Sequence, residues 1–269
     1  MNVMNIINYS LKSTTTRNNS PLLPNSIRGL IIGKSNCGKT TLLLNLLLRE
    51  GWLDYNHLYV YGKSLHQGEY KIIRKGYEEG FSKRQISNLF ISQDILTNAG
   101  ISPLQAIEQY DGIKDGGMVA NFYNDCTTIP DPSELDPSNR NLLILDDCFL
   151  GRQNKAEAYY TRGRHNNCDT FYISQNYFRL PRQTIRENSN LIILFPQDTK
   201  NLSHIYNDHC SQDISIDEFK SFCKKVWTGF NFVTIDLTSP ALNGKYRKNL
   251  DCFYLPGIYS DPHLTFNSQ

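Results

Sequence analysis

The residues best suited to chemistry lie in one short glycine-rich segment. The segment reads G-x-x-x-x-G-K-T and consists of Gly33, Lys34, Ser35, Asn36, Cys37, Gly38, Lys39 and Thr40, followed by Thr41. In such a loop the backbone N–H groups point at the phosphates of a nucleotide, and the lysine reaches the β- and γ-phosphates. We therefore expect residues 33–41 to bind ATP, with Lys39 as the catalytic cation and the Thr40 hydroxyl as one ligand of Mg²⁺.

Two adjacent carboxylates end an apolar run later in the chain. Residues 141–145 read Asn-Leu-Leu-Ile-Leu, and Asp146 and Asp147 follow them. A continuous apolar run is typical of a central parallel strand, and its carboxyl end lies at the sheet edge where α/β folds bind ligands. We expect Asp146 to hold Mg²⁺ through water and Asp147 to act as the general base that polarises the attacking water. For Asp147 the alternative is an ordinary exposed aspartate at a strand end.

Four further polar side chains could complete a site for phosphoryl transfer. Gln175 ends the next expected strand, where its amide could orient the water, sense the γ-phosphate or simply cap the strand. Arg162 and Arg164 are candidates for the cation that a neighbouring subunit supplies to the transferred phosphate, although they could equally contact DNA or lie in solvent at a helix end. Lys34 lies inside the loop and could approach the γ-phosphate, but a solvated lysine is the simpler interpretation.

A strand, a turn and a helix must frame the glycine-rich loop for this chemistry to work. The β-branched run at 27–32 predicts the strand, and the leucine-rich segment 41–50, closed by Gly51, predicts the helix. Residues 57–62 predict a second strand that ends at a glycine. This order of elements is that of a phosphate-binding βαβ unit, and it predicts an α/β sheet.

The rest of the chain continues the alternation of strands and helices after a long interruption. Residues 63–140 predict an elaborated insertion, with helices near 70–79 and 103–109, whose topology the pattern does not give. Beyond it we expect strands at 141–147, 169–175, 190–195 and 232–237, and helices at 153–162, 181–187, 200–208 and 216–227. The strand at 232–237 either closes the sheet or pairs in a hairpin with 252–255. We expect a flexible arm at 1–25 and a single domain at 26–269, in which residues 210–269 extend the sheet.

The composition of the chain limits the classes of protein to which it can belong. Its 269 residues carry a net charge of +2, which does not by itself predict a nucleic-acid partner. No apolar run is long enough to span a bilayer and no secretory signal is visible, so we expect no membrane anchor. The seven cysteines lack paired spacing, which favours reduced thiols in the cytosol or nucleus. A possible metal cluster matches no standard zinc pattern, and we interpret it as two surface histidines and two buried thiols, namely His204, His209, Cys210 and Cys223.

Positive charge is concentrated in one part of the chain. Between residues 152 and 190 three acidic residues accompany seven basic ones, which are Arg152, Lys155, Arg162, Arg164, Arg179, Arg182 and Arg186. Aromatic side chains are interleaved with them, at Tyr159, Tyr160, Tyr172, Tyr177 and Phe178. A basic and aromatic segment in an otherwise balanced chain indicates a surface that faces phosphate.

Several of these segments together resemble one family of motor proteins. Besides residues 33–40 and the Asp146-Asp147 pair, they are the stretches YTRGRHNN at 160–167, YISQNYFRLP at 172–181 and IRENSNLI at 185–192. They look like the corresponding segments of FtsK/HerA-type genome-packaging ATPases, in the branch of virophages, Maverick/Polinton elements and poxvirus-like viruses. The resemblance covers residues 27–209. One departure is that many relatives carry Asp-Glu where this chain has Asp146 and Asp147, so that the carboxylate expected to act as base is one methylene shorter.

The resemblance implies a fold, an activity and a set of partners. The fold would be an α/β P-loop NTPase of the RecA-like additional-strand (ASCE) class, with a mostly parallel sheet flanked by helices. The protein would be an ATPase that uses ATP and Mg²⁺, assembles as a ring of its own copies, a pentamer or hexamer, and drives double-stranded viral DNA into a preformed capsid. Its further partner would be a component of the capsid vertex or portal. It would act in the cytoplasm or nucleus of the host cell, at the site of virion assembly or within the virion.

Two other functions use the same kind of loop. A nucleoside or nucleotide kinase would bind ATP in the same way but would act on a small acceptor without DNA, as a monomer or dimer. A nucleotide-dependent assembly scaffold would bind without hydrolysis, and Asp147 and Gln175 would then be dispensable. Stimulation of ATP hydrolysis by long double-stranded DNA separates the motor from the kinase.

Overall fold

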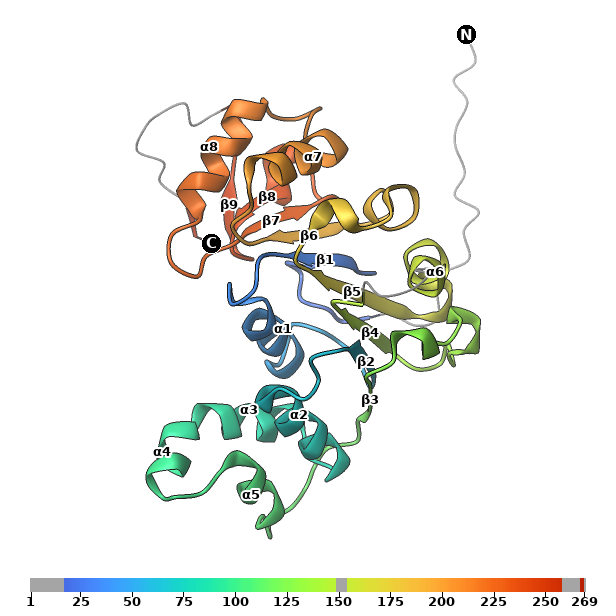
Figure 1. Cartoon of the computed structure of the whole chain (residues 1–269), viewed down its shortest axis with the longest axis vertical. Coiled ribbons are helices and arrows are strands. Elements are labelled where there is room, and N and C mark those ends of the chain that lie inside the picture. The colour runs from blue at the N-terminus through green and yellow to red at the C-terminus, as the bar shows by residue number, and fades with distance from the viewer. Residues whose placement is uncertain (1–16, 149–153, 258–266, 269) are drawn as a thin grey trace.

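The chain forms one large β-sheet with helices on both of its faces (Figure 1). The computed structural model describes residues 17–148, 154–257 and 267–268. Ten strands follow one another across the sheet in the order β10 (Asn267–Ser268), β9 (Cys252–Tyr254), β8 (Tyr246–Lys248), β7 (Val233–Asp236), β6 (Leu191–Leu194), β1 (Arg28–Ile32), β5 (Cys168–Ser174), β4 (Asn141–Asp146), β2 (His57–Gly62) and β3 (Val119–Tyr123).

The strands from β6 to β3 are parallel, so their carboxyl ends meet at one edge of the sheet. The strand that leads into the glycine-rich loop, β1, pairs with β5 on one side and with β6 on the other, and β4 lies beyond β5. An additional strand, β5, therefore separates the loop from the strand that ends in the two carboxylates. This is the additional-strand arrangement of a P-loop NTPase, and the predicted fold class is confirmed.

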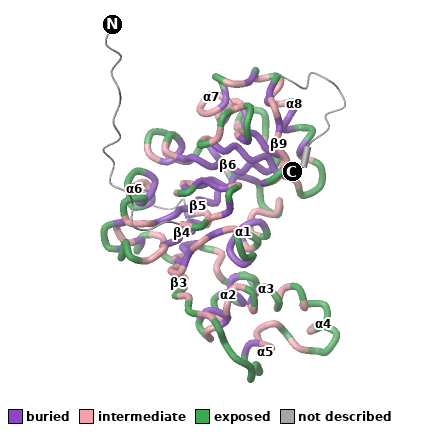
Figure 2. Tube along the Cα trace, turned by 180° about the vertical axis from the view of Figure 1, so that it is seen from behind, coloured by how far each residue is buried: buried purple, intermediate pink, exposed green. Residues whose placement is uncertain are grey.

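Each face of the sheet is covered by a hydrophobic core of its own. The helices are α1 (Lys39–Leu48), α2 (Gly68–Glu78), α3 (Lys83–Ile91), α4 (Gln93–Asn98), α5 (Pro103–Glu108), α6 (Asn154–Arg162), α7 (Thr199–His209) and α8 (Ile216–Val226). Leu30 and Ile32 of β1 pack on the face covered by α6, α7 and α8, whereas Ile31 packs on the face covered by α1 and α2. Because both faces are covered, the central strands need unbroken apolar runs, and Figure 2 shows buried residues concentrated there. Within the described ranges, no helix is long and apolar enough to cross a bilayer.

Helices α2 to α5 form a helical lobe, residues 68–108, that extends away from the sheet beside β2 and β3 (Figure 1). The sequence predicts α2 and α5, and the apolar run at 89–91 proves to be the end of α3. Reciprocal capping boxes begin α3 at Ser82 and α5 at Ser102, which fixes where these short helices start. The edge strand β3 is absent from the sequence prediction because it is short, and none of its residues is buried.

The first described residues pack against the body of the domain. The Arg17 guanidinium is 6% exposed, lies 2.9 Å from a carboxylate oxygen of Asp169 and donates a hydrogen bond to the backbone oxygen of Asn141. Leu23 is also buried. Residues 17–25 therefore differ from the flexible arm expected at 1–25, while residues 1–16 lie outside the described part of the chain. The sequence does not predict the contact between Arg17 and Asp169, because a single arginine at the end of a polar stretch forms no periodic pattern.

The C-terminal strands extend the sheet in an antiparallel manner. β7 pairs with β6, β8 pairs with β7, and β9 pairs with β8. Of the two alternatives for 232–237, the hairpin with 252–255 is therefore wrong, because β8 lies between these two strands. The sequence of β8 contains charged residues and does not look like a buried strand, but Arg247 is paired with the buried carboxylate of Asp236 at 2.7 Å.

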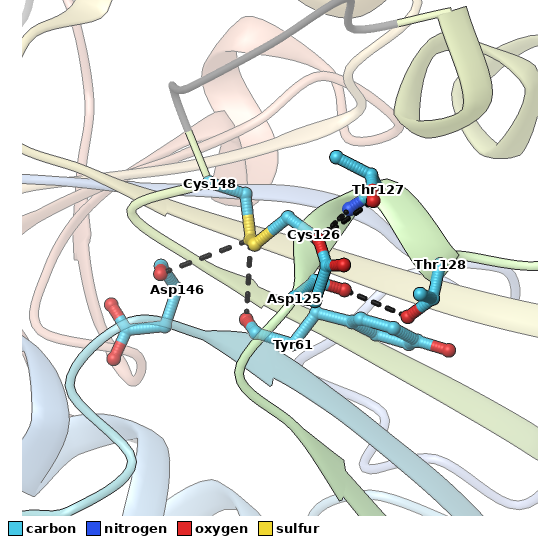
Figure 3. Close-up of a disulfide and its surroundings, with 7 residues drawn as sticks. All are labelled: Tyr61, Asp125, Cys126, Thr127, Thr128, Asp146 and Cys148. Carbon is cyan, nitrogen blue, oxygen red and sulfur yellow. Dashed lines mark hydrogen bonds between the residues drawn. A yellow bond between two sulfur atoms is a disulfide. The ribbon is translucent and has the colours of Figure 1, made fainter.

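Two of the seven cysteines form a disulfide, which corrects the expectation that all of them are thiols. Cys126 and Cys148 are 22 residues apart in sequence, and their Cα atoms are 5.8 Å apart (Figure 3). Cys126 follows β3 and Cys148 follows β4, and both of these strands pair with β2 in parallel. The shared carboxyl edge of the sheet thus brings together two cysteines whose spacing gives no hint of a pair. The free cysteines of the described residues are Cys37, Cys168, Cys210, Cys223 and Cys252.

Candidate nucleotide-binding site

The conformation of the glycine-rich loop depends on its two glycines. Its first N–H, on Gly33, donates to the backbone oxygen of Ser174 at 3.0 Å and so ties the loop to the neighbouring strand β5. A side chain at Gly33 would place its Cβ 2.5 Å from the Cys37 sulfur and 2.7 Å from the Phe195 Cβ. Gly38 adopts a φ of 102°, in the left-handed region that glycine tolerates. The two glycines of the motif are therefore required by close packing and by backbone conformation.

Lys39 is folded back over the loop at the start of α1. Its ammonium group donates to the backbone oxygens of Gly33 at 2.7 Å and of Lys34 at 2.6 Å. No acidic residue lies in the first turn of α1, and no side chain caps its N-terminus. The positive end of the helix is thus left to a ligand, and an anion there would be held by the helix N–H groups and by the ammonium group of Lys39.

A cavity of about 740 Å³ opens beside this loop and joins most of the predicted residues. Its wall includes Ser35, Asn36, Gly38, Lys39, Thr40 and Thr41 from the loop, together with Asp146, Asp147 and Gln175 from the ends of β4 and β5. Gly33, Lys34 and Cys37 belong to the same loop but do not line the cavity. The carboxyl edge of the sheet therefore gathers these side chains as the strand order requires.

Asp146 is the last residue of β4 and is largely enclosed. Burial raises the pKa of its carboxyl group above the ordinary value, and the charge of Asp147 adds to the rise. A hydrogen bond from the Tyr70 hydroxyl and the charge of Lys39 act in the opposite direction. The hydroxyl donates to Oδ2 of Asp146 at 2.7 Å. A divalent cation at this carboxylate would stabilise its ionised form, so the residue fits the role of a magnesium ligand.

Asp147 and Gln175 form one hydrogen-bonded unit with the loop. The Gln175 amide nitrogen donates to Oδ2 of Asp147 at 3.1 Å, and the Ser35 hydroxyl donates to the Gln175 amide oxygen at 3.3 Å. Asp147 has a φ of 54°, so the backbone turns sharply after Asp146. The Asp147 side chain therefore does not follow the alternating pattern of side chains along β4. The structure thus connects three residues that the sequence predicts one by one.

Arg162 and Arg164 lie far from this site. They precede β5, whereas Gln175 follows it, so the whole length of a seven-residue strand separates them from the cavity. At about 3.3 Å per residue this distance is about 20 Å. Arg162 is held by Asp131, with Nη2 2.7 Å from the carboxylate oxygen, and Arg164 is exposed. Neither arginine can reach the nucleotide site of its own chain.

The remaining arginines of the basic segment divide between surface and interior. Arg179 is exposed, and Arg182 is exposed and paired with Glu187 at 3.2 Å. Arg186 is only 7% exposed and is paired with Asp208 at 3.0 Å. Arg186 thus cannot belong to a surface that faces phosphate, which corrects that expectation for this residue. Arg152 lies outside the described residues, and Lys155 is exposed.

Most of the aromatic residues in the basic segment belong to the core. Four of the five are buried, namely Tyr159, Tyr160, Tyr172 and Tyr177. Phe178 is exposed and stacks on His204, with 4.6 Å between the ring centroids. His209 is within hydrogen-bonding distance of the Tyr177 hydroxyl, at 2.7 Å, rather than at the surface as expected. The interleaving of aromatic and basic residues in the sequence therefore reflects alternation between core and surface.

Tyr70 and Phe230 are among the residues of the site that the sequence prediction does not include. Tyr70 comes from α2, in the insertion, and no motif marks it. Phe230 lies in the loop between α8 and β7, is 82% exposed and lines the cavity beside Gly38. The signal that could have revealed Phe230 is an aromatic residue in a polar turn, Thr-Gly-Phe-Asn, where no core contact requires it.

Comparison with known proteins gives distant structural likenesses. No family model matches the chain, and no curated relative matches it. Among solved structures, B204, the DNA-packaging ATPase from Sulfolobus turreted icosahedral virus, has 13% identity and a TM-score of 0.48 over 82% of this chain and 95% of that chain. VirB4 of Thermoanaerobacter pseudethanolicus has 13% identity and a TM-score of 0.47 over 84% of this chain and 88% of that chain. The bacterial conjugative coupling protein TrwB has 12% identity and a TM-score of 0.42 over 88% and 89%.

B204 is a DNA-packaging ATPase by name. At these identities and TM-scores the likeness is distant. We therefore base the function proposed for this chain on its own residues.

Proposed function

We propose that this protein is an ATPase that moves double-stranded DNA, and that the DNA is a viral genome entering a preformed capsid. The observation that supports the motor most strongly is the division of the catalytic groups between two edges of the sheet. The loop, the carboxylates and Gln175 lie at the carboxyl edge, and Arg162 and Arg164 lie at the amino edge. In a ring with head-to-tail contacts, the amino edge of one subunit can face the nucleotide of the next.

The chain's own groups would carry out hydrolysis as follows. Lys39 and the N-terminus of α1 would hold the phosphates, and Asp147 would accept a proton from the attacking water. Gln175 would keep Asp147 in place through its hydrogen bond, and Ser35 would tie this pair to the phosphate loop. In-line attack on the γ-phosphate would then release ADP and phosphate.

Thr40 and Asp146 would hold Mg²⁺ together with the phosphates of the nucleotide. Among the described residues no group of three or more His, Cys, Asp or Glu side chains could hold a metal ion. This fits magnesium, which is usually bound through one or two carboxylates, water and substrate phosphate rather than by a cage of protein ligands. When bound, the ion would neutralise charge on the phosphate oxygens.

In this proposal the base of ATP stacks on Phe230. The ring is exposed, it lines the cavity, and its Cδ1 atom would be 3.9 Å from a Cβ at Gly38. Two asparagines support the turn that presents it, because the Asn249 amide donates to the Asn231 side-chain oxygen at 2.9 Å and the Asn231 amide donates to the backbone oxygen of Thr228 at 2.8 Å. Stacking on an aromatic face binds any base, so GTP should also bind.

Arg164 is the preferred candidate for the cation supplied to a neighbouring subunit. Both arginines are exposed, but Arg162 is already paired with Asp131. A guanidinium group placed in this way stabilises charge on the transferred phosphate and is worth about 10³ to 10⁵ in rate. Arg179, Arg182 and Lys155, all exposed, are candidates for contacts with the DNA backbone.

ATP hydrolysis measured with and without long double-stranded DNA tests the proposal. A motor predicts strong stimulation that is lost in the Lys39→Ala variant, because that variant lacks the ammonium group that holds the phosphates. A kinase predicts no effect of DNA, and a scaffold predicts no turnover in either condition. Either of these results would contradict the proposed function.

A further inference from the structure

We infer that Tyr70 is a positioning residue for Asp146, and that it sets which carboxylate oxygen is available to a divalent cation. This inference rests on the proposed function, in which Asp146 holds Mg²⁺ together with the nucleotide. Tyr70 belongs to α2 and is 1% exposed, and its hydroxyl donates to Oδ2 of Asp146 at 2.7 Å. The hydrogen bond occupies Oδ2 and leaves Oδ1 to face a metal ion or its water.

The Asp146 side chain is also confined from a second direction. Gly62 is the residue of β2 that pairs with Asp146 across the sheet. A Cβ at Gly62 would lie 3.0 Å from both the Cβ and the backbone oxygen of Asp146. The backbone of β2 therefore lies closer to Asp146 than a larger residue would permit. Between this backbone and the Tyr70 hydroxyl, the carboxylate has little freedom to turn.

The chemistry of the pair favours donation from tyrosine to carboxylate. A tyrosine hydroxyl has a proton to donate, whereas an ionised carboxylate can only accept one, and the Tyr70 hydroxyl lies 2.7 Å from Oδ2 of Asp146. A bond to an ionised acceptor is stronger than one to a neutral acceptor. The hydrogen bond from Tyr70 therefore holds Oδ2 of the ionised Asp146 carboxylate in one direction.

Tyr70 also connects the metal site to the helical lobe. Two neighbours of this residue, Gln67 and Glu69, line the nucleotide cavity. On the same helix α2, Ile73 belongs to the core shared with α3, and the Ile86 side chain packs closely over Gly76. A shift of α2 relative to the sheet would thus act directly on the Asp146 carboxylate. The insertion that carries no motif supplies the group that orients a magnesium ligand.

Tyr70→Phe tests this inference, with Tyr77→Phe as the matched control. Tyr77 lies on the same helix, is buried, and its hydroxyl pairs with the Tyr55 hydroxyl at 2.9 Å, away from the cavity. The measurement is equilibrium binding of a non-hydrolysable ATP analogue as Mg²⁺ is titrated, with a parallel titration in a chelator. We expect Tyr70→Phe to raise the Mg²⁺ concentration for half-maximal binding about tenfold, because a hydrogen bond to a charged group is lost. Binding in the chelator should stay unchanged, and Tyr77→Phe should behave as the wild type.

A double-mutant comparison separates orientation of Asp146 from a general effect on α2. In the Asp146→Asn background, Tyr70→Phe should produce no further change in Mg²⁺ dependence, since the charged acceptor is already gone. The inference is overturned if Tyr70→Phe leaves the Mg²⁺ titration unchanged, or if Tyr77→Phe shifts it as much. It is also overturned if the shift persists undiminished with Asp146→Asn. Failure of the wild type itself to bind the analogue in a Mg²⁺-dependent way would instead contradict the proposed function.

Discussion

Replacement of Gln175 by glutamate should disable the proposed general base, Asp147, in mildly acidic solution without changing the shape of the site. The Gln175 amide nitrogen is 3.1 Å from Oδ2 of Asp147, and in Gln175→Glu a carboxylate oxygen takes its place. Two like charges at that distance repel by about 5 kcal/mol when the effective dielectric constant is about 20. Because Gln175 is exposed and Asp147 is partly exposed, solvent lowers this to about 2 kcal/mol. The pair then retains a shared proton at a pH where a single carboxylate would be ionised.

A protonated pair cannot accept a proton from water, and a repulsion of about 2 kcal/mol raises the affinity of the pair for its shared proton about 30-fold, so the turnover rate of Gln175→Glu should fall in mildly acidic solution, where the wild type is still active. The rate should recover as the pH rises, because deprotonation of the pair restores the base. Gln175→Ala is the control, since it removes the hydrogen bond without adding charge. Loss of that bond is worth about 1 kcal/mol, or about fivefold in rate, with no new pH dependence. Steady-state ATP hydrolysis across mildly acidic to mildly alkaline pH, with ATP affinity measured separately, checks both variants.

Equal pH profiles for the glutamate and alanine variants would refute this reasoning. They would mean that no proton is shared at this position and that Asp147 is not the base. Weaker ATP binding by Gln175→Glu with an unchanged turnover rate would also refute it, because repulsion would then act on the γ-phosphate of bound ATP rather than on the base.

Three other perturbations have effects that the structure predicts. Phe230→Ala should weaken ATP binding at least tenfold, because stacking on a base contributes about 1 to 3 kcal/mol, while binding of inorganic tripolyphosphate stays the same. Cys126→Ser should lower the free energy of unfolding by about 3 kcal/mol in urea titrations, since the bond to Cys148 closes a loop of 22 residues. Asp146→Asn should raise the melting temperature of the nucleotide-free protein. Burial raises the folded-state pKa of Asp146 above its unfolded value, so the ionised carboxylate destabilises the fold above the unfolded pKa, and asparagine removes this penalty.

Each of these predictions has a result that would contradict it. Phe178→Ala removes an exposed ring from a different loop, and an equal loss of ATP affinity in that variant would exclude specific stacking on Phe230. If a reductant leaves the unfolding curve of the wild type unchanged, the Cys126–Cys148 bond does not support the fold. A lower melting temperature for Asp146→Asn would show that the carboxylate stabilises the nucleotide-free protein.

The part of the site that lies on sequence-local elements could be predicted from the sequence. The loop at 33–41 has a backbone pattern that depends on its own glycines, and Asp146 and Asp147 follow an apolar run that only a central strand explains. Gln175 ends the next strand. Parallel pairing brings such strand ends to one edge, so their proximity follows from the order of elements.

Contacts between distant elements could not be predicted in this way. Tyr70 is 76 residues from Asp146, and it lies on a helix of an insertion whose path depends on packing rather than on a repeating pattern. The disulfide from Cys126 to Cys148 depends on the position of β3, an edge strand that the sequence does not reveal. For the basic and aromatic segment, the sequence does not show which side chains are exposed. Their exposure depends on tertiary packing. Arg186, for example, is paired in the interior with Asp208.

Mixing two inactive variants tests most directly whether the proposed active site is completed by a neighbouring subunit. Arg164→Ala should bind ATP normally but hydrolyse it very slowly, and Asp147→Asn should bind ATP without hydrolysing it. In a mixed assembly the Asp147→Asn subunit supplies an intact Arg164 to a neighbour whose Asp147 is intact. DNA-stimulated ATP turnover by the mixture should therefore exceed that of either variant alone, and it should rise with protein concentration as subunits associate. Turnover that equals the sum of the two separate variants at every mixing ratio and concentration would contradict the account.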